Sequence, residues 1–312
     1  MENPRSDKID FAPEVDFSRI LTNPILDIGA HLWEEERYKA FKAFYRSMRK
    51  IDDLVDHKKT ALKVISREEA LFLERMMLGW LNAVRMRDYA DPFMEEFCFY
   101  LERFKIPLWP WERLVEAMVY DLRHRGFKNF ISFLRYTRGA AVAPASIFMH
   151  LCGVRETSEG YLEPLYDIRK AARPLAIFSY LVHIIRDFQK DQLNDLQYFS
   201  DDLLARNSLT HLELKEIAVT GQIKDAFRNL IRTYIRIAEY YRKKARLVID
   251  EKAAMLLPRY RLSLEMIYHL YLQIYDRIDP QNSSFSQEEL QPQPDDVNRQ
   301  IRAVIEKFSS IK

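Results

Sequence analysis

Apolar residues recur every three or four positions along nearly the whole chain, whereas alternation of apolar and polar residues is hard to find over any six-residue window. This pattern predicts an all-α protein. Ser66 and Glu69 have the spacing of a capping box and predict the start of a helix whose apolar positions run to Val84. Asn129 is the expected cap of a helix that passes through Gly139 and Pro144, where we expect a kink.

Proline and polar residues divide the rest of the chain. No proline occurs between Leu175 and Leu257, which predicts two or three long helices, and a last core helix is expected over about 259–278. A stretch rich in Gln, Pro, Ser and Asp follows and predicts a linker. We therefore expect an N-terminal segment 1–20, one helical domain 21–279, a linker 280–296 and an amphipathic C-terminal helix 297–312.

Composition excludes several classes of protein. Only 7 of the 312 residues are glycine, and no Gly-x-Gly pair occurs, so a glycine-rich phosphate loop is not expected. NADPH is therefore not indicated as a cofactor, although it remains open. The 48 basic and 46 acidic residues nearly cancel, which gives no sign of a nucleic-acid partner.

Two cysteines, Cys98 and Cys152, are too few for a disulfide framework or a zinc site. Their apolar neighbours predict buried, reduced thiols. The N-terminus has no secretory signal, and no apolar stretch reaches the roughly 20 residues that span a bilayer. We expect a cytoplasmic protein, with peripheral contact at the inner face of the membrane left open.

The first informative motif lies on an expected helix that begins near His31. Asp52 and Asp56 are four residues apart, so their carboxylates share one face at about 6 Å, where like charges oppose helix formation. A cation should compensate them, and Mg²⁺ prefers such oxygen ligands when it also binds phosphates. The alternative is a solvated acidic patch in which Arg49 and Lys50 pair with Asp52, Asp53 and Asp56.

A second acidic motif ends a markedly apolar helix. Asp187 and Asp191 are again four residues apart, and His183 lies one turn earlier on the same face. Because the helix must be buried, we expect these charges to do more than face solvent. Two helices that present Asp pairs to one cavity would form a Mg²⁺-diphosphate clamp, with Arg49 and Arg186 beside them to hold phosphate oxygens.

These segments together resemble the squalene/phytoene synthase family of head-to-head prenyltransferases. Residues 45–56 are similar to its first aspartate-rich motif, and residues 183–191 to its second. Residues 133–153 resemble the kinked helix that lines the prenyl pocket, and residues 267–278 resemble the last core helix. The resemblance covers roughly residues 20–278, in the right order.

The resemblance implies a single-domain helical bundle of the class I isoprenoid synthase type with a central prenyl cavity. Two C15 or C20 prenyl diphosphates would be joined 1′–1 through a cyclopropyl diphosphate to a squalene-, dehydrosqualene- or phytoene-type product, with no obligate protein partner. The implied catalytic residues are Asp52, Asp53, Asp56, Asp187 and Asp191, of which Asp52, Asp56, Asp187 and Asp191 would hold Mg²⁺. The implied diphosphate ligands are Tyr45, Arg49, Arg186, Tyr271 and His183, and the implied pocket residues are Phe44, Tyr136, Arg138, Phe148, Phe178, Tyr180 and Tyr198.

The chain also departs from the family pattern. His183 stands where the family usually has Asn, Tyr180 where it has Gln, Lys190 where an acidic residue is common, and Arg138 where it has Tyr. These changes leave the Asp residues intact but put the identity of the product in doubt.

Two other functions remain as alternatives. A class I terpene cyclase would share the first motif, but its second motif mixes Asn, Ser or Thr, and Glu. A catalytically silent scaffold that binds lipid or protein would have had no reason to retain all five Asp residues.

The C-terminal helix has two expected positions. Val297, Ile301, Val304, Ile305 and Phe308 fall on one face, beside several basic residues. The helix can pack back on the core, or it can lie on a membrane surface where a water-insoluble product leaves. Its short length and mixed charge favour packing on the core.

Overall fold

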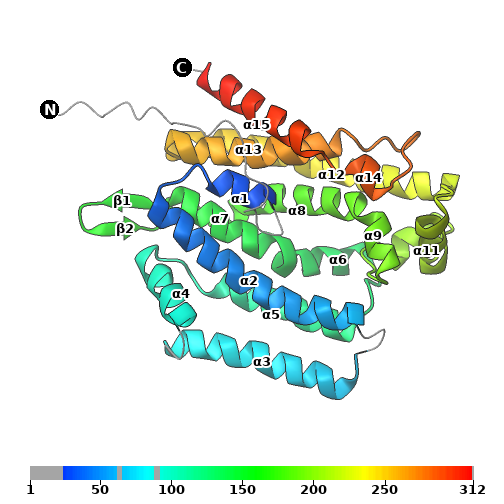
Figure 1. Ribbon diagram of the computed structural model, residues 1–312, viewed down its shortest axis with the longest axis horizontal. Coiled ribbons are helices and arrows are strands. Elements are labelled where there is room, and N and C mark those ends of the chain that lie inside the picture. Colours follow the sequence, from blue (N-terminus) through cyan, green and yellow to red (C-terminus); the bar gives the residue numbers. More distant parts are fainter. Residues whose placement is uncertain (1–23, 62–64, 88–91, 311–312) are drawn as a thin grey trace.

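Helices make up almost all the regular structure of the chain in a computed structural model that describes residues 24–61, 65–87 and 92–310. They lie roughly side by side, and a two-stranded hairpin projects from one end (Figure 1). The first half comprises α1 (Pro24–Ala30), α2 (Glu35–Ala61), α3 (Arg67–Met86), α4 (Pro92–Arg103), α5 (Trp109–Arg123), α6 (Phe130–Thr137), the π-helix η2 (Arg138–Val142), α7 (Ala143–Gly153), β1 (Arg155–Thr157) and β2 (Gly160–Leu162). The second half comprises α8 (Ile168–Arg186), α9 (Phe188–Leu193), α10 (Asp201–Arg206), α11 (His211–Thr220), α12 (Asp225–Lys252), the 3₁₀ helix η3 (Ala253–Met255), α13 (Pro258–Tyr275), α14 (Gln287–Leu290) and α15 (Pro294–Ser309).

The all-α prediction is confirmed, and several local signals act as expected. Ser66 accepts a hydrogen bond from the backbone N–H of Glu69, whose side chain accepts one from the Ser66 N–H, so the capping box that starts α3 is complete. The Asn129 side chain accepts from the Ser132 N–H at 2.9 Å and caps α6. The hairpin β1–β2, in antiparallel register with Glu156 opposite Tyr161, was not predicted because three-residue strands are too short to show a periodic pattern.

The predicted kink at Gly139 takes the form of a π-helical turn. Between α6 and α7, η2 widens the helix where it passes α5, and Gly139 is buried against that neighbour. A Cβ atom at Gly139 would lie 2.0 Å from the carbonyl oxygen of Arg113 and 2.6 Å from the Cβ of Ala117. Only glycine therefore permits this approach, which sets the direction in which α7 enters the core.

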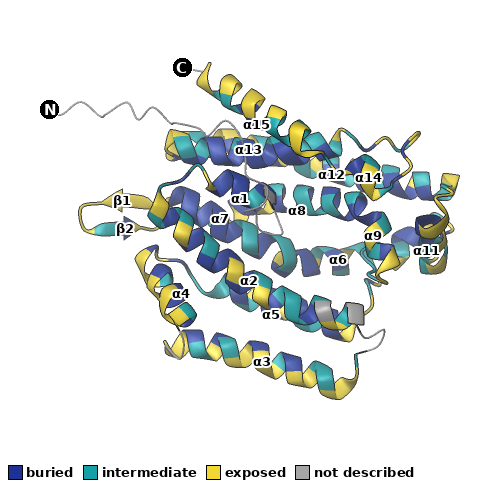
Figure 2. Cartoon of the chain, in the orientation of Figure 1, coloured by how far each residue is buried: buried dark blue, intermediate teal, exposed yellow. Residues whose placement is uncertain are grey.

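The core lies where the long helices face one another (Figure 2). Helix α8 packs along α12 and against α7 and α13, while α7 also packs against α2. Fully buried Arg37 ties this end of the bundle together: its guanidinium donates to the Leu151 carbonyl and lies 4.1 Å from the ring centroid of Tyr260. Helix α2, which carries the first acidic motif, and helix α8, whose C-terminal end begins the second, both pack against α7.

The chain beyond α13 is more ordered than a linker. The segment 280–296, predicted to be a linker, includes α14, and Phe285 and Leu290 are buried. Helix α15 packs on α13 with Ile301 and Val304 buried, so its apolar face covers the core rather than a membrane. The predicted N-terminal segment 1–20 lies outside the described residues. No described helix is long and apolar enough to cross a bilayer.

Replacement of Gly139 tests the close approach of η2 to α5. We expect Gly139→Ala to lower the free energy of unfolding by about 3 kcal/mol, because its Cβ must displace backbone atoms of α5. Gly79→Ala is the matched control: no atom lies within 4 Å of the new Cβ, and alanine should stabilise α3 by about 0.5–1 kcal/mol. Urea unfolding measures both, and equal stabilities would contradict the assignment.

Candidate active site

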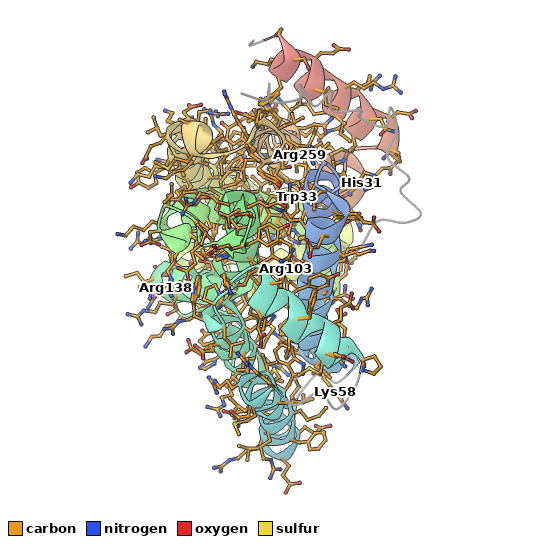
Figure 3. The ribbon with its side chains drawn as sticks, turned by 90° about the vertical axis from the view of Figure 1, so that its left-hand side faces the viewer. His31, Trp33, Lys58, Arg103, Arg138 and Arg259 are labelled. Carbon is orange, nitrogen blue, oxygen red and sulfur yellow. The ribbon has the colours of Figure 1, made fainter. Side chains whose placement is uncertain are left out.

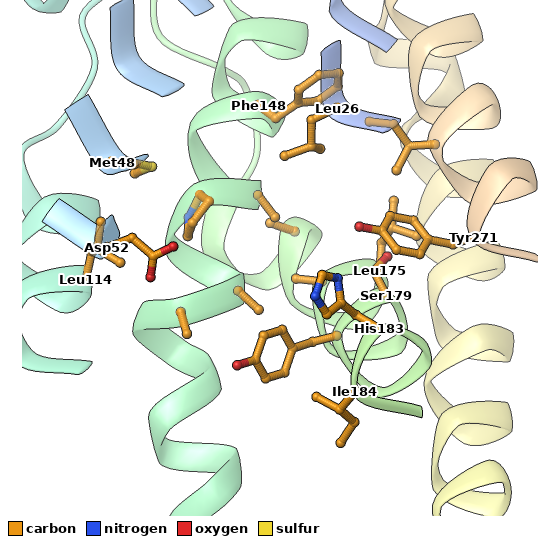
Figure 4. A pocket seen from close by; sticks show the side chains of 18 of the residues that line it. Leu26, Met48, Asp52, Leu114, Phe148, Leu175, Ser179, His183, Ile184 and Tyr271 are labelled. Carbon is orange, nitrogen blue, oxygen red and sulfur yellow. The ribbon is translucent and has the colours of Figure 1, made fainter. Parts of the chain in front are cut away.

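A cavity of about 530 Å³ runs between α2, α7, α8, α12 and α13. One end is acidic, whereas the remainder is lined mainly by Ala, Leu, Ile and aromatic side chains. Figure 4 shows Asp52 and His183 on opposite sides of this space, with Leu26 and Phe148 toward its apolar end. The lining includes fourteen of the residues implied by the sequence: Tyr45, Arg49, Asp52, Asp53, Asp56, Tyr136, Phe148, Tyr180, His183, Arg186, Asp187, Asp191, Tyr198 and Tyr271.

Three expected pocket residues lie outside the cavity wall. Phe44 points away from it and packs edge-on against Phe97 and Trp111. Phe178 packs between α8 and α13 against Tyr268 and Tyr275. Arg138 is exposed in η2 on the outside of the bundle (Figure 3). Each lies on an element that does line the cavity or leads into it, but on the wrong side of that element.

The first acidic motif combines an ion pair with repulsion between carboxylates. Arg49 donates hydrogen bonds to both Asp52 and Asp53. These two ion pairs are part of what the alternative of a solvated acidic patch predicted. The Asp52 side chain is 28% exposed, but it opens onto the cavity rather than the outer surface. Burial and the nearby Asp56 carboxylate raise the pKa of Asp52 to about 7, and burial followed by the charge of Asp121 raises the pKa of Asp56.

Asp121 does not line the cavity but lies close to the first acidic motif, and sequence reasoning missed it. It lies on α5, is 6% exposed, and accepts from Lys59 Nζ at 2.7 Å and from the Tyr136 hydroxyl at 3.2 Å. This ion pair joins the last turns of α2, close to Asp52 and Asp56, to α5. A signal was present: Asp121 occupies the helical position that follows Leu114 and Met118 on the buried face of α5, where an unpaired charge would be costly.

In the second motif, Asp187 is held by two neighbours. Helix α8 ends at Arg186, whose Nε and Nη2 donate to Asp187 at 2.6 and 2.8 Å, and His183 Nε2 lies 2.9 Å from the same carboxylate. Arg186 also lies 3.1 Å from His183 Nδ1, and because a guanidinium only donates, Nδ1 accepts and Nε2 donates to Asp187. Both imidazole nitrogens are thus engaged, so His183 orients Asp187 instead of offering a free lone pair.

The two carboxylates of this motif have opposite electrostatic environments. Burial alone would raise the pKa of Asp187, but the hydrogen bonds from Arg186 and His183 and the charge of Arg186 outweigh it and hold that pKa well below its usual range. Burial and the charge of Asp187 raise the pKa of Asp191 to about 8. Within the described residues, no hydrogen bond or ion pair to the Asp191 side chain compensates this cost.

The carboxylates of the two motifs fit a hard divalent cation whose remaining ligands come from other molecules. No three His, Cys, Asp or Glu side chains of the described residues converge tightly enough to hold a metal ion alone. Each motif supplies a pair of carboxylates, at least one of which is raised in pKa by burial and like charge. Mg²⁺ commonly binds one or two carboxylates and takes its remaining ligands from phosphates and water. Asp52, Asp56, Asp187 and Asp191 therefore fit Mg²⁺ in the presence of a diphosphate.

Comparison with known proteins agrees with this arrangement. A family model described as squalene/phytoene synthase matches residues 28–296. The chloroplastic phytoene synthase of Narcissus pseudonarcissus is 28% identical over 255 residues, which cover 81% of this chain and 56% of that protein. The chloroplastic phytoene synthase 1 of Zea mays is 26% identical over 255 residues, which cover 81% and 57%. The chain thus spans a little over half the length of these curated relatives.

Solved structures share the fold. A dehydrosqualene synthase in complex with ligand superposes with a TM-score of 0.72 at 15% identity, covering 93% of each chain. Squalene synthase HpnC from Alicyclobacillus acidocaldarius superposes with a TM-score of 0.63 at 14% identity, covering 94% of this chain and 90% of that one. None of these relatives is a terpene cyclase or a protein described as non-catalytic.

Neutralising the two carboxylates of the second motif should change stability in opposite directions. At pH 8 without divalent cations, Asp187→Asn should lower the free energy of unfolding by about 3 kcal/mol, because it leaves Arg186 buried without its anion. Asp191→Asn should raise it, because it removes a charge that burial and Asp187 disfavour. Urea unfolding of both variants measures the two changes.

The pH dependence follows from the sign of each shift. Asp191 has a raised pKa in the folded state, so its charge destabilises the fold progressively as pH rises from about 4 to about 8; the advantage of Asp191→Asn should grow over that range. Asp187 has a lowered pKa, so its stabilising effect is complete above about pH 4 and is lost in more acidic solution. The assignment fails if both variants change stability in the same direction at pH 8.

Proposed function

The chain belongs to the squalene/phytoene synthase family, and from that premise we propose that it joins two prenyl diphosphates head to head (1′–1). The observation that carries the proposal is the arrangement of the cavity, in which Asp pairs from α2 and from the α8–α9 junction face one end of a largely apolar space. Such a space suits a substrate with an anionic head and a hydrocarbon tail.

The acidic end would bind the diphosphate head. Asp52, Asp56, Asp187 and Asp191 would hold Mg²⁺, and His183 would keep Asp187 in position. When bound, Mg²⁺ neutralises the charge that grows on the diphosphate as the bond between carbon and oxygen breaks. Asp53 stands beside them as the partner of Arg49.

Cationic and hydroxyl groups of the chain would hold the departing diphosphate. Arg49 and Arg186 line the cavity next to the two Asp pairs and present planar, multiply donating groups that match phosphate oxygens. Tyr45 and Tyr271 line the same end and are buried, so a hydroxyl from either one would act in a water-poor environment.

The apolar part would hold the prenyl chains and exclude water. Allylic cations are quenched by water, and Phe148 with the aliphatic lining supplies dry walls. Tyr136, Tyr180 and Tyr198 also line the cavity, and burial raises the pKa of each hydroxyl well above its usual value. These rings therefore stay neutral, and their faces can stabilise positive charge.

The reaction then proceeds in two parts. The first prenyl diphosphate loses its diphosphate to give an allylic cation, the double bond of the second attacks that cation, and loss of a proton closes a cyclopropyl diphosphate. Ionisation of that intermediate, rearrangement and loss of a second proton would give a dehydrosqualene- or phytoene-type product, whereas a squalene-type product would need a hydride from a reductant such as NADPH in place of the second proton loss. The chain's contribution to both parts is the same, because each one requires a held diphosphate and a dry cavity.

Turnover tests the proposal directly. With farnesyl or geranylgeranyl diphosphate and Mg²⁺, we expect release of pyrophosphate by the natural chain, reduced roughly a hundredfold or more in Asp52→Asn. Asp195→Asn is the matched control, because Asp195 is exposed, pairs with Lys215 and lies outside the cavity. Undiminished release by Asp52→Asn, or no release by the natural chain with either substrate, would refute the proposal.

Binding of the head group can be measured without turnover. Mg²⁺ together with inorganic pyrophosphate should raise the melting temperature by a few degrees, because a ligand at 100 times its dissociation constant stabilises by about 2.7 kcal/mol. Asp195→Asn should keep the part of this shift that requires Mg²⁺, whereas Asp187→Asn should lose most of that part. An equal Mg²⁺-dependent shift in both variants would contradict the assignment of the head-group site.

A further inference from the structure

A second hollow adjoins the cavity on the outer side of α2. It has a volume of about 520 Å³ and lies between α2 and α3. We call it the outer groove, and it is lined by Arg46, Arg49, Lys50, Asp53, Leu54, Lys58 and Leu73. Arg49 and Asp53 also line the cavity, so the same turn of α2 forms part of both walls.

The outer groove is strongly cationic. Four basic side chains face one carboxylate, Asp53, which already accepts a hydrogen bond from Arg49. Arg46, Lys50 and Lys58 are exposed, and Lys58 lies near the end of α2 (Figure 3). Among the described residues, no carboxylate forms an ion pair with any of these three.

The spacing of these residues makes the lack of ion-pair partners costly for the stability of α2. Arg46, Lys50, Leu54 and Lys58 follow one another at intervals of four and form a single stripe along α2. Like charges four residues apart destabilise a helix, in the same way as the Asp pair on its cavity face. An anion held between these side chains would remove that repulsion.

An unpaired donor where the outer groove meets the cavity also indicates that an anion binds there. Arg49 uses Nη1 for Asp52 and Nη2 for Asp53, while its Nε is buried and has no hydrogen-bond partner among the described residues. Buried N–H donors are nearly always satisfied, so an unpaired one beside a basic groove favours an acceptor from a ligand.

We propose that the outer groove is a second binding subsite for diphosphate anions, connected to the cavity through Arg49. This inference rests on the proposed function, because that reaction brings prenyl diphosphates in and sends inorganic pyrophosphate out. A diphosphate carries several negative charges and many acceptor oxygens, which match Arg46, Lys50 and Lys58. The head group of an incoming substrate and the departing pyrophosphate share this chemistry.

Direct binding without Mg²⁺ tests the subsite, because the Asp pairs repel an anion when no cation is present. Calorimetric titration with inorganic pyrophosphate in EDTA should show binding to the natural chain. The triple variant Arg46→Gln, Lys50→Gln, Lys58→Gln should bind at least tenfold more weakly. A matched control, Arg236→Gln, Lys243→Gln, Lys244→Gln, removes three exposed cations from α12 and should bind like the natural chain.

Steady-state kinetics with Mg²⁺ identify the source of the diphosphate. If departing pyrophosphate uses the outer groove, the triple variant should need at least tenfold more pyrophosphate for product inhibition while KM for the prenyl diphosphate is unchanged. If incoming substrate uses it, KM should rise at least fivefold in the triple variant. Either result supports the subsite.

The proposal is overturned if the triple variant matches the α12 control in Mg²⁺-free binding, whatever its kinetics. This outcome differs from failure of the proposed function, which would appear as absent turnover by the natural chain while binding in EDTA remained measurable. Melting temperatures no lower than that of the natural chain would show that both triple variants are folded.

Discussion

The concentration of carboxylates at one end of a largely apolar cavity is the constraint on which the rest of the structure depends. Burying like charges is expensive, and this protein compensates them unequally. Asp187 is bonded to Arg186 and His183, Asp52 shares Arg49 with Asp53, and Asp191 has no partner among the described residues. The part of this charge that has no partner must be neutralised by a cation or a proton. The arrangement therefore favours binding of a cation.

The surrounding helices hold this charge in place through contacts that are distant in sequence. Lys59 of α2 forms an ion pair with Asp121 of α5, and Asp121 also accepts a hydrogen bond from the hydroxyl of Tyr136 on α6. The π-helical turn that follows α6 is possible only because Gly139 lets η2 approach α5 closely. Packing at Gly139 therefore also positions the ring of Tyr136 near the acidic end of the cavity. The need for a glycine at this position thus bears on the geometry of the acidic site.

Local rules in the sequence predicted the elements and the acidic motifs well. Caps such as Ser66 and Asn129 and the four-residue spacing of the Asp pairs depend on neighbours within one turn, so they can be read directly. The direction in which each side chain points was harder to predict. Phe178 lies on α8, which is apolar on nearly every side, so periodicity could not distinguish the face that lines the cavity from the face that packs on α13.

The remaining differences have the same physical origin. The pairing of Lys59 with Asp121 joins residues 62 positions apart, and no pattern within either helix specifies it. Phe285 and Leu290 are too few apolar residues to distinguish a docked segment from a polar linker, and their burial depends on the surface that α9 and α12 present. Sequence reasoning thus predicted most of the residues that line the cavity, and tertiary contacts decided which side of each helix a side chain faces.

If the site binds Mg²⁺ and a diphosphate as proposed, its ion pairs imply that the two bind cooperatively. Arg49 and Arg186 are the proposed donors for the diphosphate, and both are engaged by carboxylates. An anion alone would have to separate these pairs and leave Asp52 and Asp187 exposed to its own charge. A cation alone would compete with the same guanidinium groups. When both arrive, each carboxylate exchanges an arginine for the cation and each arginine exchanges a carboxylate for the anion, so every charge stays paired. Because such coupling is reciprocal, either ion must raise the affinity for the other by the same factor.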